Sequence, residues 1–334
     1  MRKPMIAVPM GDAAGIGPEI LVKSFCDPQL HDSRIVVIGD KHVMENACGI
    51  CGADVHIRVI QDIRDADFEP KVIPLIETEA IDKERFRFGE LSAMCGKAAF
   101  SYIQKSIDLA MHHQVDAIAT PPINKESLRL AGLEYIGHTE IFAELTGTKD
   151  PQTMFQTGNL RVLFLTRHVS LRQACALITK ERIVDFVKRS VESLSKLGIG
   201  EGKMAIAGLN PHCGEHGLFG DEEGREILPA VKELQEAGYP VEGPIGADSV
   251  FYLARQGRYN CVLSLYHDQG HIACKTLDFE KTVSITNGMP ILRTSVDHGT
   301  AYDIAGRGIA SEISMVEAIL TAEKYAPLFR ASGA

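Results

Sequence analysis

The sequence has no apolar stretch long enough to cross a membrane and no excess of basic residues. No run approaches the roughly 20 apolar residues of a membrane-spanning helix, and Pro9, Gly11 and Asp12 interrupt the N-terminal apolar stretch too early for a signal peptide. The chain carries 35 Lys and Arg against 44 Asp and Glu. This balance argues against a nucleic-acid surface and against binding to anionic membranes. We predict a cytoplasmic protein that holds any anionic ligand through a local cluster of residues.

Paired cysteines and nucleotide-binding motifs are also scarce. Among eight cysteines, Cys48 and Cys51 form the only CxxC pair, which is weak support for a zinc or redox site. We expect reduced thiols instead. The segment "GDAAGIGPE" at 11–19 has neither the GxGxxG spacing nor the Lys-Ser pair of a P-loop. Both common fingerprints of nucleotide binding are therefore missing.

Short β-branched runs alternate with longer helical patterns along the chain. This alternation predicts an α/β protein with largely parallel sheets, and a length of 334 residues suits two domains. The predicted strands are 5–9, 34–39, 71–76, 116–120, 161–166, 203–208, 261–266 and 282–286, and the clearest helices are 95–113, 179–198 and 221–238.

Three histidines each follow a predicted buried strand. His168 follows the strand at 161–166, His212 follows 203–208, and His267 follows 261–266. Ligands of open α/β sheets bind beyond the carboxyl ends of the strands, so three neutral imidazoles there can converge on one metal ion. Each histidine taken alone is also explained as a hydrogen-bonded loop residue.

A second group of residues suits an anion. His138 and Thr139 begin a predicted helix, where unpaired backbone N–H groups and the helix dipole favour a phosphate or carboxylate. Lys275 and Arg293 are the cations that can complete such a site. The alternatives are that Thr139 only caps its helix and that both cations are solvated.

Six motifs together resemble one enzyme family. "PMGDAAGIGPEI", "GHTEIF", "LNPHCGEHGLFGDEE", "GPIGADSVF", "YHDQGHIACK" and "RTSVDHGTAYDIAGRG" are similar, in the same order, to motifs of the 4-hydroxythreonine-4-phosphate dehydrogenase family of vitamin B6 synthesis. The last motif, which alone reads as an ordered surface loop, also resembles the NAD-binding loop of isocitrate and isopropylmalate dehydrogenases. That related fold binds NAD without GxGxxG, which accounts for its absence.

The resemblance implies an isocitrate and isopropylmalate dehydrogenase-like homodimer whose active sites are shared across the interface. Residues 1–135 and 300–334 would form an α/β domain contributing to NAD binding, and 136–299 an α/β domain with the metal site and the dimer interface. Contact with NAD is expected from His298, Gly299, Thr300, Asp303 and Gly306.

In the family, residues matching the three histidines bind a divalent metal, which is Zn, Co, Mg or Mn. The resemblance implies that His168, His212 and His267 are these ligands, with His267 supplied by the partner subunit. The residues that match the family's phosphorylated-substrate site are His138, Thr139, Lys275 and Arg293.

The implied reaction is NAD-dependent oxidation of the 3-hydroxyl of a 4-phosphorylated four-carbon acid, followed by decarboxylation. A divalent ion lowers the pKa of the hydroxyl and stabilises the enolate formed as carbon dioxide leaves. Lys275 and Asp248 are the catalytic candidates, with Asp248 as general base. Asp268 and His138 are rivals for that role, and a helix cap explains Asp248 equally well.

The predicted strand 282–286 departs from the vitamin B6 enzymes. Ser284 stands where they carry a substrate-binding asparagine, and Asn287 follows where an apolar residue is usual. This pattern is similar to a second branch of the family, which converts 4-phospho-D-threonate or 4-phospho-D-erythronate to dihydroxyacetone phosphate. The alternatives are 4-hydroxythreonine-4-phosphate dehydrogenase of pyridoxal phosphate synthesis and a non-catalytic metal- or phosphate-binding paralogue. A remoter branch acts on dihydrodiols without phosphate, against which the retained phosphate-site residues argue.

Overall fold

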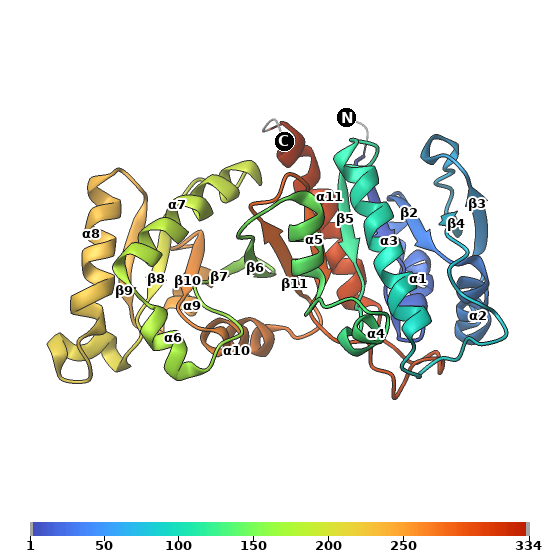
Figure 1. The fold of residues 1–334 in the computed structure, drawn as a ribbon. Coiled ribbons are helices and arrows are strands. Elements are labelled where there is room, and N and C mark those ends of the chain that lie inside the picture. The colour runs from blue at the N-terminus through green and yellow to red at the C-terminus, as the bar shows by residue number, and fades with distance from the viewer. Residues whose placement is uncertain (1–2, 332–334) are drawn as a thin grey trace. The chain divides into compact units, whose positions relative to one another are not determined.

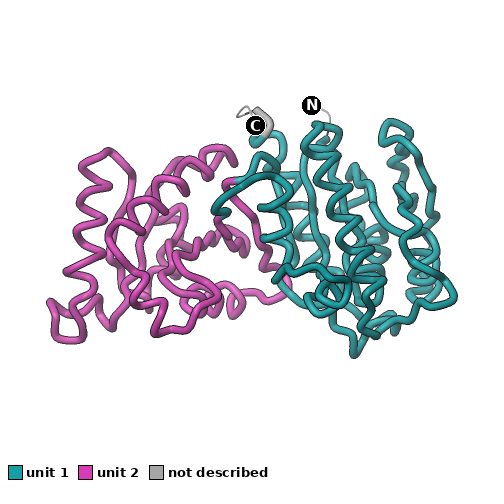
Figure 2. The backbone as a smooth tube through the Cα atoms, in the orientation of Figure 1, with its two compact units in different colours: residues 1–151, 289–334 teal, residues 152–288 magenta. Residues whose placement is uncertain are grey.

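The computed structural model describes residues 3–331 and divides the chain into two compact units (Figures 1 and 2). Unit 1 contains residues 1–151 and 289–334, and unit 2 contains residues 152–288. The unit boundaries fall at other positions than the expected 135/136 and 299/300. His138 and Arg293 consequently both belong to unit 1. The predicted α/β class with mostly parallel strands is confirmed.

Unit 1 contains a sheet in which all the described pairs are parallel. Strand β1 is buried along its whole length, as expected for a strand with an apolar run that is covered on both faces. The strand order is β3 (His56–Ile60), β4 (Val72–Glu77), β2 (Arg34–Gly39), β1 (Met5–Pro9), β5 (Ala117–Thr120) and β12 (Arg293–Val296).

The helices of unit 1 cover this sheet. Helix α11 packs against β5 and β12, and α3 packs against β1. Ser92 caps α3 by accepting a hydrogen bond from the Cys95 N–H. The helices are α1 (Gly17–Cys26), α2 (Lys41–Cys51), α3 (Ala93–Met111), α4 (Lys125–Leu130), α5 (His138–Thr146) and α11 (Ile313–Ala331), with 3-10 turns at Pro28–Leu30 and Ile63–Asp65.

Unit 2 contains a mixed sheet. Strand β6 runs antiparallel to β11 and β7, whereas β7, β10, β8 and β9 are parallel. The order is β11 (Thr282–Asn287), β6 (Gln152–Thr157), β7 (Leu160–Phe164), β10 (Cys261–Ser264), β8 (Met204–Ala207) and β9 (Val241–Ile245). The helices are α6 (Leu171–Leu177), α7 (Lys180–Lys196), α8 (Leu228–Glu236), α9 (Val250–Arg255) and α10 (His267–Leu277), with a 3-10 segment at Pro211–Gly217 and a π-helical turn at Glu223–Ile227.

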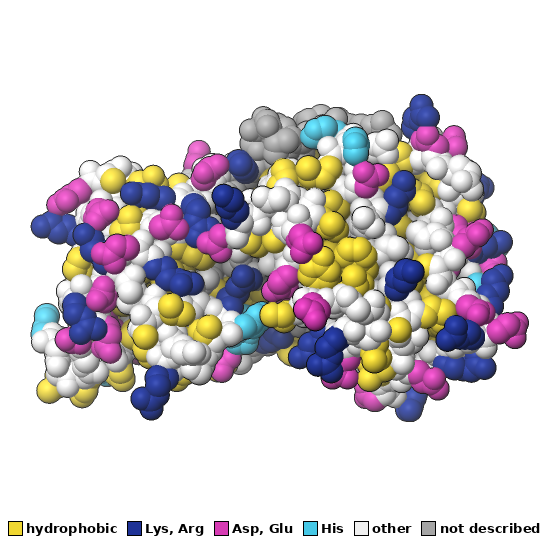
Figure 3. Space-filling model, viewed as in Figure 1, with side chains coloured by type: hydrophobic (Ala, Val, Ile, Leu, Met, Phe, Trp, Pro, Cys, Tyr) yellow, Lys and Arg dark blue, Asp and Glu magenta, His cyan; other side chains and the backbone are white. Residues whose placement is uncertain are grey.

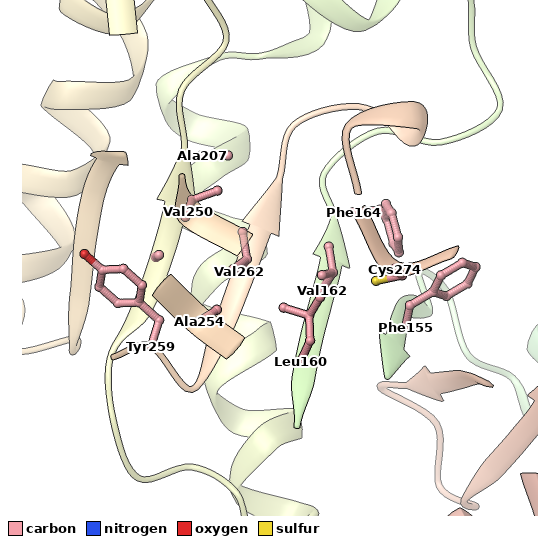
Figure 4. Close-up of a cluster of buried hydrophobic side chains, with 11 residues drawn as sticks. Phe155, Leu160, Val162, Phe164, Ala207, Val250, Ala254, Tyr259, Val262 and Cys274 are labelled. Carbon is pink, nitrogen blue, oxygen red and sulfur yellow. The ribbon is translucent and has the colours of Figure 1, made fainter. Parts of the chain in front are cut away.

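The core of unit 2 fixes the position of α10. Phe155, Val162 and Phe164 from the sheet lie in one buried cluster with Cys274 from α10 (Figure 4). A Cβ atom at Gly270 would lie 2.6 Å from Phe164 Cε1. Only glycine therefore lets α10 approach the sheet this closely.

The visible surface carries interspersed acidic and basic side chains (Figure 3). Among the described residues, no helix is both long and apolar enough to span a membrane.

Candidate active site

The strands that precede the three predicted metal ligands are neighbours. Strand β10 lies between β7 and β8 and is parallel to both. Parallel strands end at the same edge of a sheet, so His168, His267 and His212 follow strand ends along a single edge. This is where ligands bind in open α/β sheets.

Two of the three histidines lie together in one chain. The ring centroids of His168 and His267 are 6.0 Å apart, and both residues line a cavity of about 430 Å³. The ring of His212 instead lies beside Phe219, with centroids 6.4 Å apart. Within residues 3–331, no three His, Cys, Asp or Glu side chains are grouped closely enough to hold a metal ion. A three-histidine site therefore needs a rearrangement or a second chain.

The neighbouring carboxylate orients His267. Its Nδ1 lies 2.6 Å from Asp268 Oδ1. When Nδ1 donates its proton to this carboxylate, the lone pair of Nε2 is left for a metal, an arrangement common around metal-binding histidines. Asp268 is one of the rival general-base candidates, and this contact suits it to orienting His267 instead.

His271 is a further histidine beside His267, and the sequence analysis did not single it out. Its ring stacks on that of His267 at 3.6 Å, and its Nδ1 lies 2.8 Å from the His267 carbonyl oxygen. The rings of Phe155 and Phe164 lie 4.3 and 4.5 Å away. Burial lowers the pKa of His271 to about 4. The i, i+4 spacing of His267 and His271 in a helix was the available signal.

His212 lies on a left-handed segment. His212, Cys213, Glu215 and His216 all have positive φ, with values of 53°, 55°, 44° and 57°. Left-handed backbone costs roughly 1–2 kcal/mol for each residue that is not glycine. Such strain persists only where surrounding contacts hold it, and it is often found at functional sites.

Glu223 provides those contacts. Its Oε1 accepts the backbone N–H groups of Leu209 and Asn210 at 2.8 and 2.6 Å, and its Oε2 accepts the Asn210 side-chain amide at 2.8 Å. Only 2% of Glu223 is exposed. A buried carboxylate thus anchors the start of the segment that carries His212.

Gln269 joins the ends of two of these strands. Its Oε1 accepts the Leu265 N–H at 2.7 Å, and its Nε2 donates to the Gly208 carbonyl at 2.8 Å. Leu265 follows β10 and Gly208 follows β8. This buried amide therefore fixes the segment of His267 relative to that of His212.

The two catalytic candidates of unit 2 have different surroundings. Asp248 is exposed in the turn before α9 and makes no capping bond, because the N-cap of this helix is Ser249. Burial, followed by the charges of Glu223 and Asp248, raises the pKa of the Cys213 thiol. Lys275 lies in the last turn of α10 with its Nζ 5.0 Å from the Phe279 ring centre. Ser284 is buried in β11, opposite Phe155.

His138 is the first residue of α5, and its N-cap is Gly137. The idea that Thr139 only caps the helix is therefore wrong, because Thr139 already lies inside the first turn. Among the described residues, His138 Nε2 is buried without a hydrogen-bond partner. Burial and then the charge of Arg293 hold the pKa of His138 well below its ordinary value. A neutral imidazole with a buried, unused nitrogen suits a polar ligand.

Arg293 is a buried cation in the same unit. Only 4% of it is exposed, so the alternative of a solvated charge is wrong for this residue. Its Nε and Nη2 donate to Thr120 Oγ1 at 3.2 and 2.9 Å, and its Cζ lies 5.0 Å from the centre of the Phe142 ring. His138 packs near the same ring, at 6.4 Å between centroids. Phe142 therefore brings together two residues of the predicted anion site.

The residues of the predicted NAD-binding loop fall into two groups. Gly299 and Asp303 are exposed, and His298 is partly exposed. Thr300 is buried, and its carbonyl accepts the Ile16 N–H at 3.0 Å. Gly306 donates its N–H to Glu19. The first group is accessible to a cofactor, whereas the second fixes the loop to its own unit.

The CxxC pair gives no sign of reactivity. Cys48 and Cys51 are partly buried free thiols on α2. Burial raises the pKa of each thiol to about 11, whereas reactive cysteines have lowered pKa values.

Comparisons with known proteins agree along nearly the whole chain. The family model for pyridoxal phosphate biosynthetic protein PdxA matches residues 31–322. A Clostridium botulinum protein described as "Putative D-threonate 4-phosphate dehydrogenase" is 58% identical over 330 residues, which cover 98% of this chain and 99% of the relative. A Fusobacterium nucleatum protein with the same description is 58% identical over 326 residues, or 97% and 98% of the two chains.

Solved structures are also similar along nearly the whole chain. The 4-hydroxythreonine-4-phosphate dehydrogenase from Klebsiella pneumoniae superposes with a TM-score of 0.91 at 42% identity, over 97% of this chain and 98% of that one. A terephthalate 1,2-cis-dihydrodiol dehydrogenase from Burkholderia xenovorans superposes with a TM-score of 0.67 at 28% identity, over 97% and 98%.

Proposed function

The chain belongs to the pyridoxal phosphate biosynthetic protein PdxA family of dehydrogenases, and we propose that it oxidises 4-phospho-D-threonate or 4-phospho-D-erythronate with NAD and a divalent metal. One observation carries the proposal: β7, β10 and β8 are adjacent parallel strands, and their carboxyl ends are followed by His168, His267 and His212. The substrate follows from Ser284 and from the relatives described as acting on D-threonate 4-phosphate.

The donor set fits a divalent metal. The ring centroids of His168 and His267 are 6.0 Å apart, and both residues line one cavity. Asp268 engages Nδ1 of His267, so Nε2 stays available for a metal. With His212 they provide three imidazoles, which favour zinc or cobalt over magnesium or manganese. A bound ion would lower the pKa of the substrate hydroxyl and polarise the carbonyl formed from it.

Residues of the chain supply binding and proton transfer. Arg293 and Lys275 offset the negative charge of the phosphorylated acid, and His138 and Thr139 offer a ring nitrogen and N–H groups at the start of α5. With NAD bound as the hydride acceptor, Asp248 would take the proton of the 3-hydroxyl during the oxidation at C3. The C1 carboxylate then leaves as carbon dioxide and C2 gains a proton, which gives dihydroxyacetone phosphate.

The alternative functions differ in features of this chain. A 4-hydroxythreonine-4-phosphate dehydrogenase would bind an amine at C2 instead of a hydroxyl, and the Ser284 departure disfavours it. A dihydrodiol dehydrogenase has no phosphate to pair with Arg293, which is almost fully buried here. A non-catalytic module has no need for three histidines at one edge together with an NAD-binding loop.

Formation of NADH at 340 nm tests the proposal. We expect a rate with 4-phospho-D-threonate or 4-phospho-D-erythronate that requires NAD and is abolished by a chelator and restored by zinc or cobalt. His212→Asn should lower kcat/KM about 100-fold or more because a ligand is lost. His216→Asn is a matched control, since His216 is exposed on the same left-handed segment. The proposal fails if neither acid yields NADH or if both variants behave alike.

A further inference from the structure

The segment 11–19, "GDAAGIGPE", has no nucleotide fingerprint, yet it contacts the predicted NAD-binding loop. The Ile16 N–H donates to the Thr300 carbonyl at 3.0 Å. A Cβ atom at Gly15 would lie 2.8 Å from Thr300 Cβ. The two segments are therefore so close that position 15 has no space for a side chain.

Asp12 forms a second contact through its buried carboxylate. It is 0% exposed. Its Oδ1 accepts the Ala14 N–H at 2.9 Å, and its Oδ2 accepts the Tyr302 hydroxyl at 2.8 Å. Ser127 Oγ lies 2.9 Å from the same hydroxyl. Burial raises the pKa of both Asp12 and Tyr302, so solvent competes little for this hydrogen bond.

Two residues of α1 hold the far end of the loop. Glu19, also 0% exposed, accepts the Gly306 N–H. Lys23 donates its Nζ to the Ala310 carbonyl. Contacts thus recur from Thr300 to Ala310, and the side chain of Asp303 is left exposed.

We propose that segment 11–19 is the positioning element of the NAD-binding loop and that Asp12 acts on the cofactor only through Tyr302. This inference rests on the proposed use of NAD. A loop held in its bound conformation loses less entropy when ligand binds, so these contacts increase cofactor affinity. The motif then has a role in dinucleotide binding without touching the dinucleotide.

Tyr302→Phe removes the hydroxyl and keeps the ring, and NADH fluorescence measures the consequence. We expect the Kd for NADH and the KM for NAD to rise about tenfold, while kcat at saturating NAD and the KM for the phosphorylated acid stay within twofold. Tyr259→Phe is the matched control, since the Tyr259 hydroxyl donates to Glu242 at 2.9 Å within unit 2. It should leave the Kd for NADH unchanged.

Two further variants keep the test decisive. Asp12→Asn combined with Tyr302→Phe should weaken NADH binding no more than the stronger single variant, because both variants act on the same hydrogen bond. Ser127→Ala, which leaves the Asp12 contact in place, should have a smaller effect and serves if Tyr302→Phe does not fold.

The outcomes separate this inference from the proposed function. Normal NADH affinity in Tyr302→Phe overturns the positioning role and leaves NAD-dependent oxidation standing. If Tyr302→Phe does not fold, normal affinity in Ser127→Ala has the same meaning. An equal loss in Tyr259→Phe overturns it as well, because general destabilisation then explains the effect. Absence of NADH binding to the wild-type protein overturns both.

Discussion

Burial separates His138 from the exposed histidines of the chain. Its Nε2 is buried without a partner among the described residues, and its pKa is held well below the ordinary value by burial and then by Arg293. The sequence indicated its place at a helix start but not its environment, because burial depends on Phe142 and Arg293, of which the latter is distant in the chain. The same holds for Arg293, a cation that the sequence left open as solvated.

The depressed pKa of His138 makes stability depend on pH. Below about pH 6.5 the unfolded chain protonates this residue and the folded chain does not, so the free energy of unfolding falls by up to about 1.4 kcal/mol per pH unit. This contribution is fully present above pH 6.5. We expect the stability difference between wild type and His138→Asn to shrink as pH falls.

Urea unfolding at pH 7.5 and 5.5 measures that difference. The control is His56→Asn, at an exposed position of β3. A difference between wild type and His138→Asn that is the same at both pH values would contradict the assigned pKa direction.

The elements that the sequence predicted are those with clear apolar patterns. All eight predicted strands are present, and four of them (β5, β7, β8 and β10) are one or two residues shorter than predicted. Four strands were missed, and they alternate polar with apolar residues, are less apolar or contain breakers: β3 is "HIRVI", β6 is "QTMFQT", β9 is "VEGPI" and β12 is "RTSV". The predicted helix 221–238 begins as a π-helical turn, in which Glu223 faces the His212 segment instead of solvent.

That π-helical turn gives a prediction about metal affinity. Glu223→Gln replaces one acceptor oxygen by an N–H donor, which then faces the donating amide of Asn210. We expect the left-handed segment to loosen and zinc affinity to fall about tenfold. Competition with a chromogenic chelator measures it. Glu226→Gln is the matched control, because Glu226 accepts the Lys180 N–H instead; an equal fall in both variants would argue against a specific role for Glu223.

At the scale of the whole molecule, the active site is expected to need two copies of the chain. An exposed apolar side chain follows each of His168, His212 and His267 by a few residues in the sequence. Leu171 is 60% exposed, Leu218 is 71% exposed and Ile272 is 64% exposed. A second copy covering them would also bring its own histidines close. The resemblance implies that His267 crosses, whereas the 6.0 Å separation lets His168 and His267 serve one ion from the same chain.

Mixing inactive variants decides which histidine crosses. His168→Asn, His212→Asn and His267→Asn are combined in pairs after subunit exchange. A pair whose ligands come from different chains regains one intact site per hybrid dimer, roughly a quarter of wild-type activity. If His267 comes from the partner subunit, His267→Asn should complement both other variants. If His212 comes from the partner subunit, the mixture of His168→Asn with His267→Asn should stay inactive. No recovery in any pair, with exchange verified, would contradict a shared site.

The sequence predicted the fold class and the position of the three histidines after strand ends, since strand ends follow from local patterns. The strand order, in which β10 lies between β7 and β8, is known only from the structure. It did not reveal Glu223 or the contact of Asp12 with Tyr302, because each depends on packing between separate segments. His271 was missed although it lies one helical turn from His267 in α10. The likeness to isocitrate and isopropylmalate dehydrogenases, the dimer and the bound metal remain predictions.

Substrate choice is the central claim, and a side-by-side measurement of kcat/KM tests it most directly. With the same metal and NAD, 4-phospho-D-threonate or 4-phospho-D-erythronate should exceed 4-hydroxythreonine 4-phosphate, by up to about 10⁴-fold where a buried polar group is left mismatched. Ser284→Asn should move the ratio toward the amine, because Ser284 lies buried in β11. A higher kcat/KM for 4-hydroxythreonine 4-phosphate in the wild-type protein would contradict the account and assign the chain to pyridoxal phosphate synthesis.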